Sequence, residues 1–294
     1  MKPPRFQYGA PSTLQAALDL LGRYGQDAKV LAGGQSLMPL LNMRLATPSY
    51  LIDINRISEL DYITARDGYL AVGALARQHQ IERSAVVQQH HPLIVEAVQH
   101  IGHMQIRNRG TIAGSIAHAD PAAELPALLT CLNGEIIASS VRGQRTIKAQ
   151  DFFQGYLTTA LEPEEILTEV RFPWLPPDAG WAFTEFARRS GDYALTGAVA
   201  VLLPAPDGRC LSARISYFGV SATPKRGDAI EKLLTNTSLD DSIINAAGEL
   251  AAQIVSDESS DIHATSEYRR ALATELTKRV LKAAWRHCKK EEGA

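Results

Sequence analysis

The sequence predicts an α+β protein built of two domains. Apolar residues recur at helical spacing in some segments and form short, strand-like runs in others, so helices and strands are interleaved along the chain. Residues 173–180, Pro-Trp-Leu-Pro-Pro-Asp-Ala-Gly, concentrate prolines that oppose both helix and sheet, and we expect the two domains to meet there. With 294 residues, 45% of them hydrophobic and 21% charged, the chain can bury a sizeable core.

The N-terminal part is expected to hold a small β–α–β arrangement. A helix is predicted from about Ser12 to Tyr24, because its leucines share one face and Gly25 is placed to end it. Ser12 and Gln15 are expected to form a capping box at its start. Further along, residues 28–32 predict a strand that ends in two glycines, 37–45 a helix with a proline in its first turn, and 51–54 the next strand.

The middle of the chain is predicted to contain strands and helices around one irregular segment. Strands are expected at 69–72, 135–138 and 165–172, and helices at 92–101 and 125–132. Residues 105–123, with glycines at 110 and 114, match neither helical nor strand periodicity. His90 and His91 are expected to be an exposed pair between helices.

Residues beyond the proline-rich segment are expected to form a smaller C-terminal α+β domain. Strands at 181–188, 194–203 and 211–220 predict an antiparallel sheet, with a proline-rich turn at 204–208 between the last two. Helices are expected at 226–234, 240–254 and 266–288.

Charge and cysteine content exclude several classes of protein. The formal net charge of −2 provides no basic field for nucleic acid or an anionic membrane. Cys131, Cys210 and Cys288 are widely spaced, so no cysteine-ligated metal site or iron–sulfur cluster is indicated, and unpaired cysteines are typical of a reducing cytoplasm. No signal peptide or membrane-spanning run is recognisable, and we expect a soluble cytoplasmic protein.

The first candidate binding segment is Ala32-Gly33-Gly34-Gln35-Ser36, at the end of a predicted strand. Adjacent glycines allow the backbone to approach a ligand and allow successive N–H groups to point at one anion. No lysine or arginine lies between Lys29 and Arg44, so the backbone would have to bind such an anion. The segment matches neither a Rossmann fingerprint nor a P-loop, and a simple tight turn is the alternative.

The second candidate segment spans residues 107–115, Arg-Asn-Arg-Gly-Thr-Ile-Ala-Gly-Ser, and a surface turn is again the alternative. Two such segments make a shared ligand the better interpretation. The following His118-Ala119-Asp120-Pro121-Ala122-Ala123-Glu124 does not have a recognised metal-ligand spacing. Glu124 could stabilise the first turn of the next helix or accept hydrogen bonds from a ligand. No catalytic acid–base or serine-hydrolase arrangement is apparent.

Three segments, 32–40, 51–55 and 107–124, together resemble the FAD-binding medium subunits of molybdenum hydroxylases. That family includes the flavoprotein of carbon monoxide dehydrogenase and subunits of bacterial xanthine, nicotine and quinoline dehydrogenases. The resemblance covers nearly the whole chain. It implies a vanillyl-alcohol-oxidase-type FAD-binding domain at 1–176, with subdomains of about 1–57 and 58–176, followed by a C-terminal domain at 177–294. The scattered cysteines exclude the branch that carries an extra iron–sulfur insertion in this subunit.

The resemblance also implies which residues bind FAD. The first motif would lie against the FAD pyrophosphate, and the second would also contact the cofactor. The implied residues are Val30, Leu31, Ala32, Gly33, Gly34, Gln35, Ser36, Leu37, Thr111, Gly114, Ser115, His118, Glu124 and Tyr193. Glu124 would lie near the adenosine end and Tyr193 near the isoalloxazine ring, although Tyr193 could instead be a half-buried strand aromatic. Ala113 replaces a glycine found in many members, at a cost of about 1 kcal/mol if the position needs a positive φ.

The family resemblance implies an electron-transfer role with no catalytic residue in this chain. Substrate would be hydroxylated at a molybdopterin centre on a large subunit, and two [2Fe–2S] clusters on a small subunit would pass electrons to the FAD bound here. The external acceptor would be NAD, oxygen, a quinone or a cytochrome, and the complex would be a dimer of heterotrimers. Two alternatives remain open: a stand-alone FAD-dependent oxidoreductase, and a non-enzymatic nucleotide-binding subunit.

Overall fold

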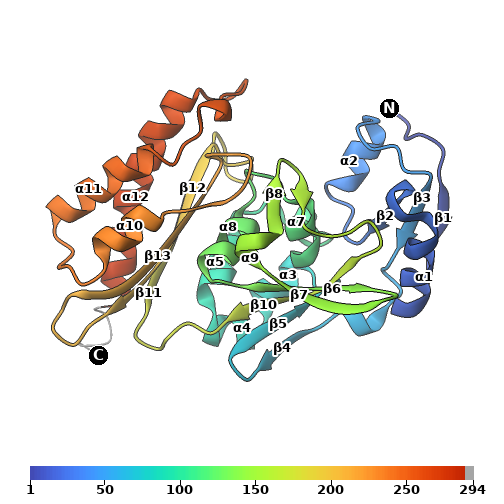
Figure 1. Ribbon diagram of the computed structural model, residues 1–294, viewed down its shortest axis with the longest axis horizontal. Coiled ribbons are helices and arrows are strands. Elements are labelled where there is room, and N and C mark those ends of the chain that lie inside the picture. Colours follow the sequence, from blue (N-terminus) through green and yellow to red (C-terminus); the bar gives the residue numbers. More distant parts are fainter. Residues whose placement is uncertain (289–294) are drawn as a thin grey trace.

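The computed structural model describes residues 1–288, so the last six residues of the predicted C-terminal domain lie outside it. The molecule is elongated, and its N-terminal, central and C-terminal parts follow one another along the long axis (Figure 1). The N-terminal part contains β1 (Gln7–Gly9), α1 (Leu14–Tyr24), β2 (Ala28–Leu31), α2 (Leu37–Asn42) and β3 (Tyr50–Asp53). The strands are parallel in the order β1-β3-β2, which confirms the predicted β–α–β arrangement.

The start of α1 differs by one residue from the predicted capping box. Thr13, not Ser12, is the N-cap, and its side chain accepts a hydrogen bond from the Ala16 N–H at 3.3 Å. Gln15 instead donates from Nε2 to Asp19 at 2.8 Å. Ser and Thr are both good caps, so the two adjacent hydroxyls could not be distinguished by type alone.

The central part is a five-stranded antiparallel sheet covered by short helices. The strands run in the order β4-β5-β10-β6-β7: β4 (Ile63–Arg66), β5 (Tyr69–Gly73), β6 (Glu135–Ser140), β7 (Gly143–Lys148) and β10 (Ile166–Pro173). The helices are α3 (Gln78–Arg83), α4 (Ala85–His90), α5 (Pro92–His100), α6 (Met104–Arg107), α7 (Ile112–His118), α8 (Glu124–Cys131) and α9 (Ala149–Phe152), with the hairpin β8 (Phe153–Gly155) and β9 (Thr158–Thr159).

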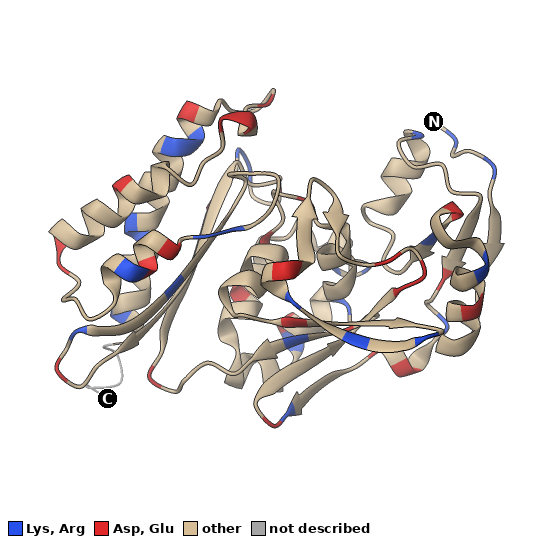
Figure 2. Ribbon diagram, viewed as in Figure 1, with Lys and Arg blue, Asp and Glu red and all other residues tan. Residues whose placement is uncertain are grey.

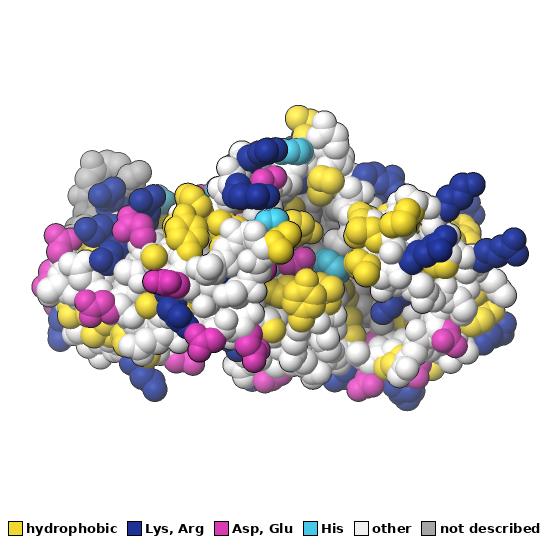
Figure 3. Space-filling view, turned by 90° about the horizontal axis from the view of Figure 1, so that it is seen from above, with side chains coloured by type: hydrophobic (Ala, Val, Ile, Leu, Met, Phe, Trp, Pro, Cys, Tyr) yellow, Lys and Arg dark blue, Asp and Glu magenta, His cyan; other side chains and the backbone are white. Residues whose placement is uncertain are grey.

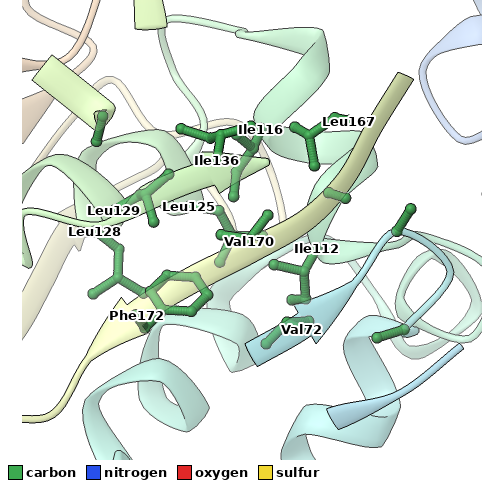
Figure 4. Close-up of a cluster of buried hydrophobic side chains, with 14 of the residues drawn as sticks. Val72, Ile112, Ile116, Leu125, Leu128, Leu129, Ile136, Leu167, Val170 and Phe172 are labelled. Carbon is green, nitrogen blue, oxygen red and sulfur yellow. The ribbon is translucent and has the colours of Figure 1, made fainter. Parts of the chain in front are cut away.

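The core of the central part fixes the orientation of α7. Ile112 and Ile116 are fully buried and point toward Val170 and Leu167 of the sheet (Figure 4). Gly114, which lies between the two isoleucines, stays partly exposed. The apolar face of α7 is therefore held by the core, while its other face remains available at the surface.

The segment 105–123 was predicted to be irregular, and this prediction is wrong for much of it. It contains most of α6 and all of α7, which are four and seven residues long. A helix of two turns shows too few periodic positions to be recognised, and packing of its apolar face stabilises it in place of intrinsic propensity.

The prediction that His91 is exposed is also wrong. His91 is fully buried, its Nε2 lies 2.9 Å from the Pro173 carbonyl oxygen, and its ring packs beside Phe172 and Trp174. The neighbouring His90 is exposed, as predicted. The sequence pair therefore separates into one buried and one exposed ring at the junction of α4 and α5.

The C-terminal part is a four-stranded antiparallel sheet with helices on one face (Figure 1). It contains β11 (Gly180–Phe186), β12 (Thr196–Pro204), β13 (Cys210–Phe218), β14 (Lys225–Arg226), α10 (Asp228–Leu234), α11 (Asp241–Ala252) and α12 (Ser266–Cys288). The opposite face meets the central part, where α8 packs against β12 and β13. These elements confirm the predicted α+β fold class and the antiparallel C-terminal sheet.

Acidic and basic residues are interspersed along the ribbon of all three parts (Figure 2). Within residues 1–288, each helix is too short or too polar to cross a bilayer.

Candidate functional site

The first glycine loop follows β2 and spans residues 32–36. Gly34 has a φ of 74°, in the left-handed region that favours glycine. Gln35 folds back over the loop, with Nε2 donating to the Gly33 carbonyl at 3.2 Å. Within residues 1–288, the backbone N–H groups of Gly33, Gly34, Gln35 and Ser36 donate to no protein acceptor. Four successive donors on a partly exposed loop are thus free to bind an anion.

The second glycine loop leads into α7. Thr111 is the N-cap of this helix, and its Oγ1 accepts from the Gly114 N–H at 2.9 Å. Ala113 lies in the first turn of α7 and does not have a positive φ, so the strain considered for an alanine there does not arise. Thr111 is buried, whereas Gly114 and Ser115 are partly exposed. The hydroxyl of Thr111 therefore caps α7. The partly exposed residues of this loop, Gly114 and Ser115, come after it in the sequence.

The two loops touch through their backbones. A Cβ atom on Gly33 would lie 2.4 Å from the Arg109 carbonyl oxygen and 2.9 Å from the Gly110 Cα atom. Such distances are shorter than any real contact, so only glycine permits this approach. Segments far apart in the sequence consequently form one continuous surface, as a shared ligand requires.

A partly buried polar link, which sequence analysis did not identify, ties the loops together. Arg77 donates from Nη2 to Asn55 Oδ1 at 2.5 Å and from Nη1 to the Arg109 carbonyl at 2.7 Å. Asn55 donates from Nδ2 to the Ala32 carbonyl at 2.9 Å, so each loop is held by one end of the link. Partial burial lowers the pKa of Arg77, as does the nearby Arg109, but an arginine stays charged at pH 7.

Local sequence signals pointed to one of these two residues. Asn55 ends the segment 51–55, one of the three that carry the family resemblance. Arg77 belongs to no such segment. It reaches the site because it pairs with Thr111 in an isolated antiparallel bridge, a contact between segments more than thirty positions apart by number.

His118, Asp120 and Glu124 lie at the other end of α7. His118 is the last residue of that helix, and its Nε2 is 4.0 Å from Asp120 Oδ2. Burial lowers the pKa of His118, so its ring is neutral at pH 7. Asp120 Oδ1 accepts from the Ala122 N–H at 2.9 Å and shapes the turn.

Glu124 is the first residue of α8 and is only 7% exposed. Burial, aided by the carboxylates of Glu185 and Asp120, raises its pKa to about 8. Its carboxyl group is therefore largely protonated at neutral pH and can donate as well as accept a hydrogen bond. The expected place in the first helical turn is confirmed, but the side chain is not the ionised carboxylate that usually stabilises a helix start.

Tyr193 lies in the loop between β11 and β12 and is 64% exposed, so the alternative of a half-buried strand residue is wrong. Desolvation by the surrounding protein raises the pKa of its hydroxyl, and the nearby carboxylates of Asp120 and Glu124 raise it further. Gly191 in the same loop has a φ of 84°, and a Cβ there would lie 2.6 Å from His103 Cε1. The structure thus brings Tyr193 near the turn that follows α7.

The predicted site residues fall into two groups at opposite ends of α7. The first group comprises Val30, Leu31 and Leu37 with the two glycine loops, and the second comprises His118, Glu124 and Tyr193. From Thr111, at the start of α7, to His118, at its end, the helix rises about 10 Å along its axis, and Gly114 and Ser115 lie between them. Seen from above, the surface is hollowed between the N-terminal part and the rest of the molecule, with a histidine and an acidic side chain nearby (Figure 3).

Two cavities lie away from these loops. One of about 430 Å³ is lined by residues of α5 and by Trp181, and one of about 200 Å³ lies between Leu14 and Glu169. Neither is lined by a residue of either glycine loop. These two cavities therefore do not belong to the candidate site formed by the glycine loops.

Comparisons with known proteins agree with this arrangement. The family model described as the FAD binding domain in molybdopterin dehydrogenase matches residues 4–175. The model described as the CO dehydrogenase flavoprotein C-terminal domain matches residues 181–284. The fold and these matches define a flavoprotein with an FAD-binding domain.

Relatives match over almost their full length. The nicotine 6-hydroxylase medium subunit of Paenarthrobacter nicotinovorans is 42% identical over 281 residues, covering 96% of this chain and 98% of the relative. The carbon monoxide dehydrogenase medium chain of Hydrogenophaga pseudoflava is 37% identical over 289 residues, covering 98% and 100%. A solved structure of carbon monoxide dehydrogenase from Hydrogenophaga pseudoflava superimposes with a TM-score of 0.95 at 38% identity, over 98% of this chain and 100% of that one. The chain belongs to the family of FAD-binding medium subunits of molybdenum hydroxylases, and it is an oxidoreductase subunit.

The residues present fit the cofactor of that family. The pyrophosphate of FAD is anionic, and the four N–H groups of residues 33–36, which have no acceptor within residues 1–288, are the kind of donors that bind it without a lysine or arginine. A Cβ atom at Gly33 would lie within 3 Å of the Arg109 carbonyl oxygen, and one at Gly114 within 3 Å of Thr111 Oγ1. The backbone of each glycine loop therefore depends on glycine at these positions.

Proposed function

We propose that this chain is the FAD-binding electron-transfer subunit of a molybdopterin-dependent hydroxylase or dehydrogenase. It would accept electrons from [2Fe–2S] clusters on a small partner subunit and deliver them to an external acceptor. Substrate hydroxylation would take place at the molybdopterin centre of a large partner subunit. The observation that supports FAD binding most directly is the run of backbone N–H groups at residues 33–36, which meet no acceptor in the described part of the chain and lie against the second loop.

In this proposal FAD supplies the redox chemistry when bound, and the protein binds and orients it. The N–H groups from Gly33 to Ser36 would hold the pyrophosphate, with Val30, Leu31 and Leu37 providing apolar walls beside them. Thr111, Gly114 and Ser115 would form the second wall of the cradle. These roles are supported by the contact of the two loops and by the backbone N–H groups of the first loop, which donate to no acceptor within residues 1–288.

The second group of residues would contact the remainder of the cofactor. Glu124, largely protonated at neutral pH, could donate a hydrogen bond to the adenosine end. His118, neutral at the end of α7, could accept one. Tyr193, whose raised pKa keeps its hydroxyl protonated, would present its ring to the isoalloxazine. This chain needs no general base of its own in that role.

We also propose the domain limits that sequence analysis suggested: 1–176 for FAD binding, with subdomains of about 1–57 and 58–176, and 177–294 for the C-terminal domain. The family matches at 4–175 and 181–284 support this division. The subdomain limit falls between β3 and β4, where one sheet ends and the next begins.

The partners follow from the relatives. Several are named as subunits or chains of larger enzymes, including a 6-hydroxypseudooxynicotine dehydrogenase complex. We propose a cytoplasmic dimer of heterotrimers, with NAD, oxygen, a quinone or a cytochrome as acceptor.

Purification from the native host tests the proposal. We expect the chain to copurify with a molybdopterin protein and a small iron–sulfur protein, and to contain about one FAD per chain. Flavin-free, well-folded protein that takes up no added FAD would refute FAD binding.

The same preparation distinguishes the two alternatives. A stand-alone oxidoreductase would carry FAD and oxidise a small substrate without any partner subunit. A non-enzymatic nucleotide-binding subunit would lack the absorption spectrum of bound flavin.

A further inference from the structure

A buried arginine of α12 has no role in the function proposed above. Arg269 is 5% exposed, although an arginine is costly to bury unless its charge and donors are satisfied. Its Nη1 donates to the carbonyl oxygens of Leu195 and Gly219, the latter at 2.9 Å. Its Nη2 donates to Asp261 Oδ2 at 2.7 Å. One guanidinium therefore joins three separate segments of the C-terminal part.

Two of these segments lead directly to the second group of site residues. Leu195 lies two positions after Tyr193 and ends the loop that carries it. Gly219 donates its own N–H to the Pro121 carbonyl at 2.8 Å, within the turn that joins His118 to Glu124. Arg269 consequently reaches both sides of the proposed flavin contact through backbone groups.

The backbone of residue 219 can approach the Leu195 carbonyl this closely only because residue 219 is glycine. Gly219 has a φ of 70°, and a Cβ there would lie 2.4 Å from the Leu195 carbonyl oxygen. Two carbonyl oxygens that converge in a buried place repel each other, and the shared guanidinium offsets this repulsion. Arginine suits this position because its planar donors can bind several acceptors at once, whereas lysine presents a single point charge.

Asp261 keeps the arginine in place. Its Oδ1 accepts from the N–H groups of His263 and Ala264 at 2.7 and 2.9 Å, which leaves Oδ2 for Arg269. Asp261 is thus fixed by its own loop before it meets the arginine.

We propose that Arg269 is a positioning residue for the flavin. By holding the Leu195 and Gly219 carbonyls, it sets where the Tyr193 ring lies relative to the turn of residues 118–124. This inference rests on the proposed function, because it takes Tyr193 and that turn to contact FAD.

The test uses the full chain loaded with FAD. Arg269→Met removes the charge and donors, and Arg269→Lys keeps only the charge. Arg270→Met is the matched control, since Arg270 is the next residue on α12 and pairs with the exposed Asp257. FAD affinity, fluorescence of the bound flavin and its midpoint potential are measured beside circular dichroism and thermal unfolding.

We expect Arg269→Met to weaken FAD binding about tenfold and to increase the flavin fluorescence, because the quenching Tyr193 ring is no longer fixed. Arg269→Lys should have an FAD affinity and a flavin fluorescence between those of Arg269→Met and the parent. Arg270→Met should have the parental values of both. If Arg269→Met does not fold, Arg269→Lys and Asp261→Asn decide the question with the same measurements.

A second variant separates positioning from general destabilisation. In a Tyr193→Ala background, Arg269→Lys should no longer change flavin fluorescence, because the ring it positions is absent. The proposal is overturned if folded Arg269 variants keep the parental affinity, fluorescence and potential, or if their spectral effect persists without Tyr193. A parent protein that binds no FAD would refute the proposed function itself, and this inference with it.

Discussion

The guanidinium of Arg77 donates a hydrogen bond of 2.5 Å from Nη2 to the side-chain oxygen of Asn55. Asn55 follows β3 in the N-terminal part, whereas Arg77 precedes α3 in the central part, so this bond crosses from one part of the molecule to the other. Because Asn55 also holds the Ala32 carbonyl and Arg77 the Arg109 carbonyl, the pair sets the spacing of the two glycine loops.

Replacing Arg77 with methionine should separate the loops. The substitution leaves the Asn55 and Arg109 oxygens without their donor, so we expect the free energy of unfolding to fall by about 1.5–3 kcal/mol, the usual value for hydrogen bonds to a charged group. FAD affinity should fall about tenfold or more, because the pyrophosphate cradle is no longer preorganised. Urea unfolding and titration with FAD measure the two effects.

Arg83→Met is the control for that substitution. Arg83 is exposed at the far end of α3, so its loss should change both quantities little. If Arg77→Met were destabilised yet bound FAD with parental affinity, the link would be structural only, and the loops would not need it for binding.

Gly33→Val should abolish FAD retention while leaving most of the fold intact. Any Cβ at this position would lie 2.4 Å from the Arg109 carbonyl, so the two loops must move apart. Gly114→Val should act similarly, because its Cβ would lie 2.7 Å from Thr111 Oγ1 and displace the cap of α7. Flavin content per chain and circular dichroism give the result.

Gly22→Val provides the comparison for the glycine variants. A Cβ at Gly22 would meet Val141 only at an ordinary contact distance of 3.8 Å. This variant should keep its flavin, and unchanged flavin content in the Gly33 and Gly114 variants as well would show that the cofactor lies elsewhere.

The existence of the two loops could be predicted from sequence because their signals are local. Paired glycines after an apolar strand, and glycines beside hydroxyl and arginine side chains at 107–115, can be read within a few residues. Their contact could not be predicted in the same way, since Gly33 meets Arg109 only after two separate sheets have packed. Arg77 was missed for the same reason, because only its pairing with Thr111 brings it to the site.

Burial explains the remaining differences between prediction and structure. His90 and His91 are identical in type, yet only the second meets the Pro173 carbonyl and the core. Glu124 was correctly placed at a helix start, but its protonation depends on residues such as Glu185 that are distant in sequence. Charge state is thus a tertiary property that local pattern does not encode.

Glu124 should make the FAD-free protein less stable as pH rises from 4.5 to about 8. Its folded pKa of about 8 exceeds the unfolded value of 4.5, so the folded state binds more protons throughout this window. The loss can approach about 1.4 kcal/mol per pH unit and levels off above the folded pKa. Glu124→Gln stays neutral at both pH values. Its free energy of unfolding, relative to that of the parent, should therefore be higher at pH 8 than at pH 5.

Urea unfolding of both proteins at pH 5 and pH 8 checks this pH dependence. Glu249→Gln, on the exposed side of α11, is the matched control and should show no such dependence. A Glu124→Gln effect of equal size at both pH values would mean that the carboxyl group is ionised in the folded protein.

His91 should give the opposite dependence on the acid side. Burial lowers its folded pKa to about 4, below the ordinary value of 6.5, so the unfolded state binds more protons between these values. The contribution of His91 to the free energy of unfolding is complete above pH 6.5. It is lost as pH falls toward 4, by up to about 1.4 kcal/mol per pH unit.

His91→Asn can still donate to the Pro173 carbonyl but does not titrate, so the free energy of unfolding should fall less steeply with acid in this variant. His90→Asn alters the exposed neighbour and should leave that sensitivity unchanged. Because the two rings are adjacent in sequence, a reduction in the His91 variant alone would assign the acid sensitivity to burial at the junction of α4 and α5.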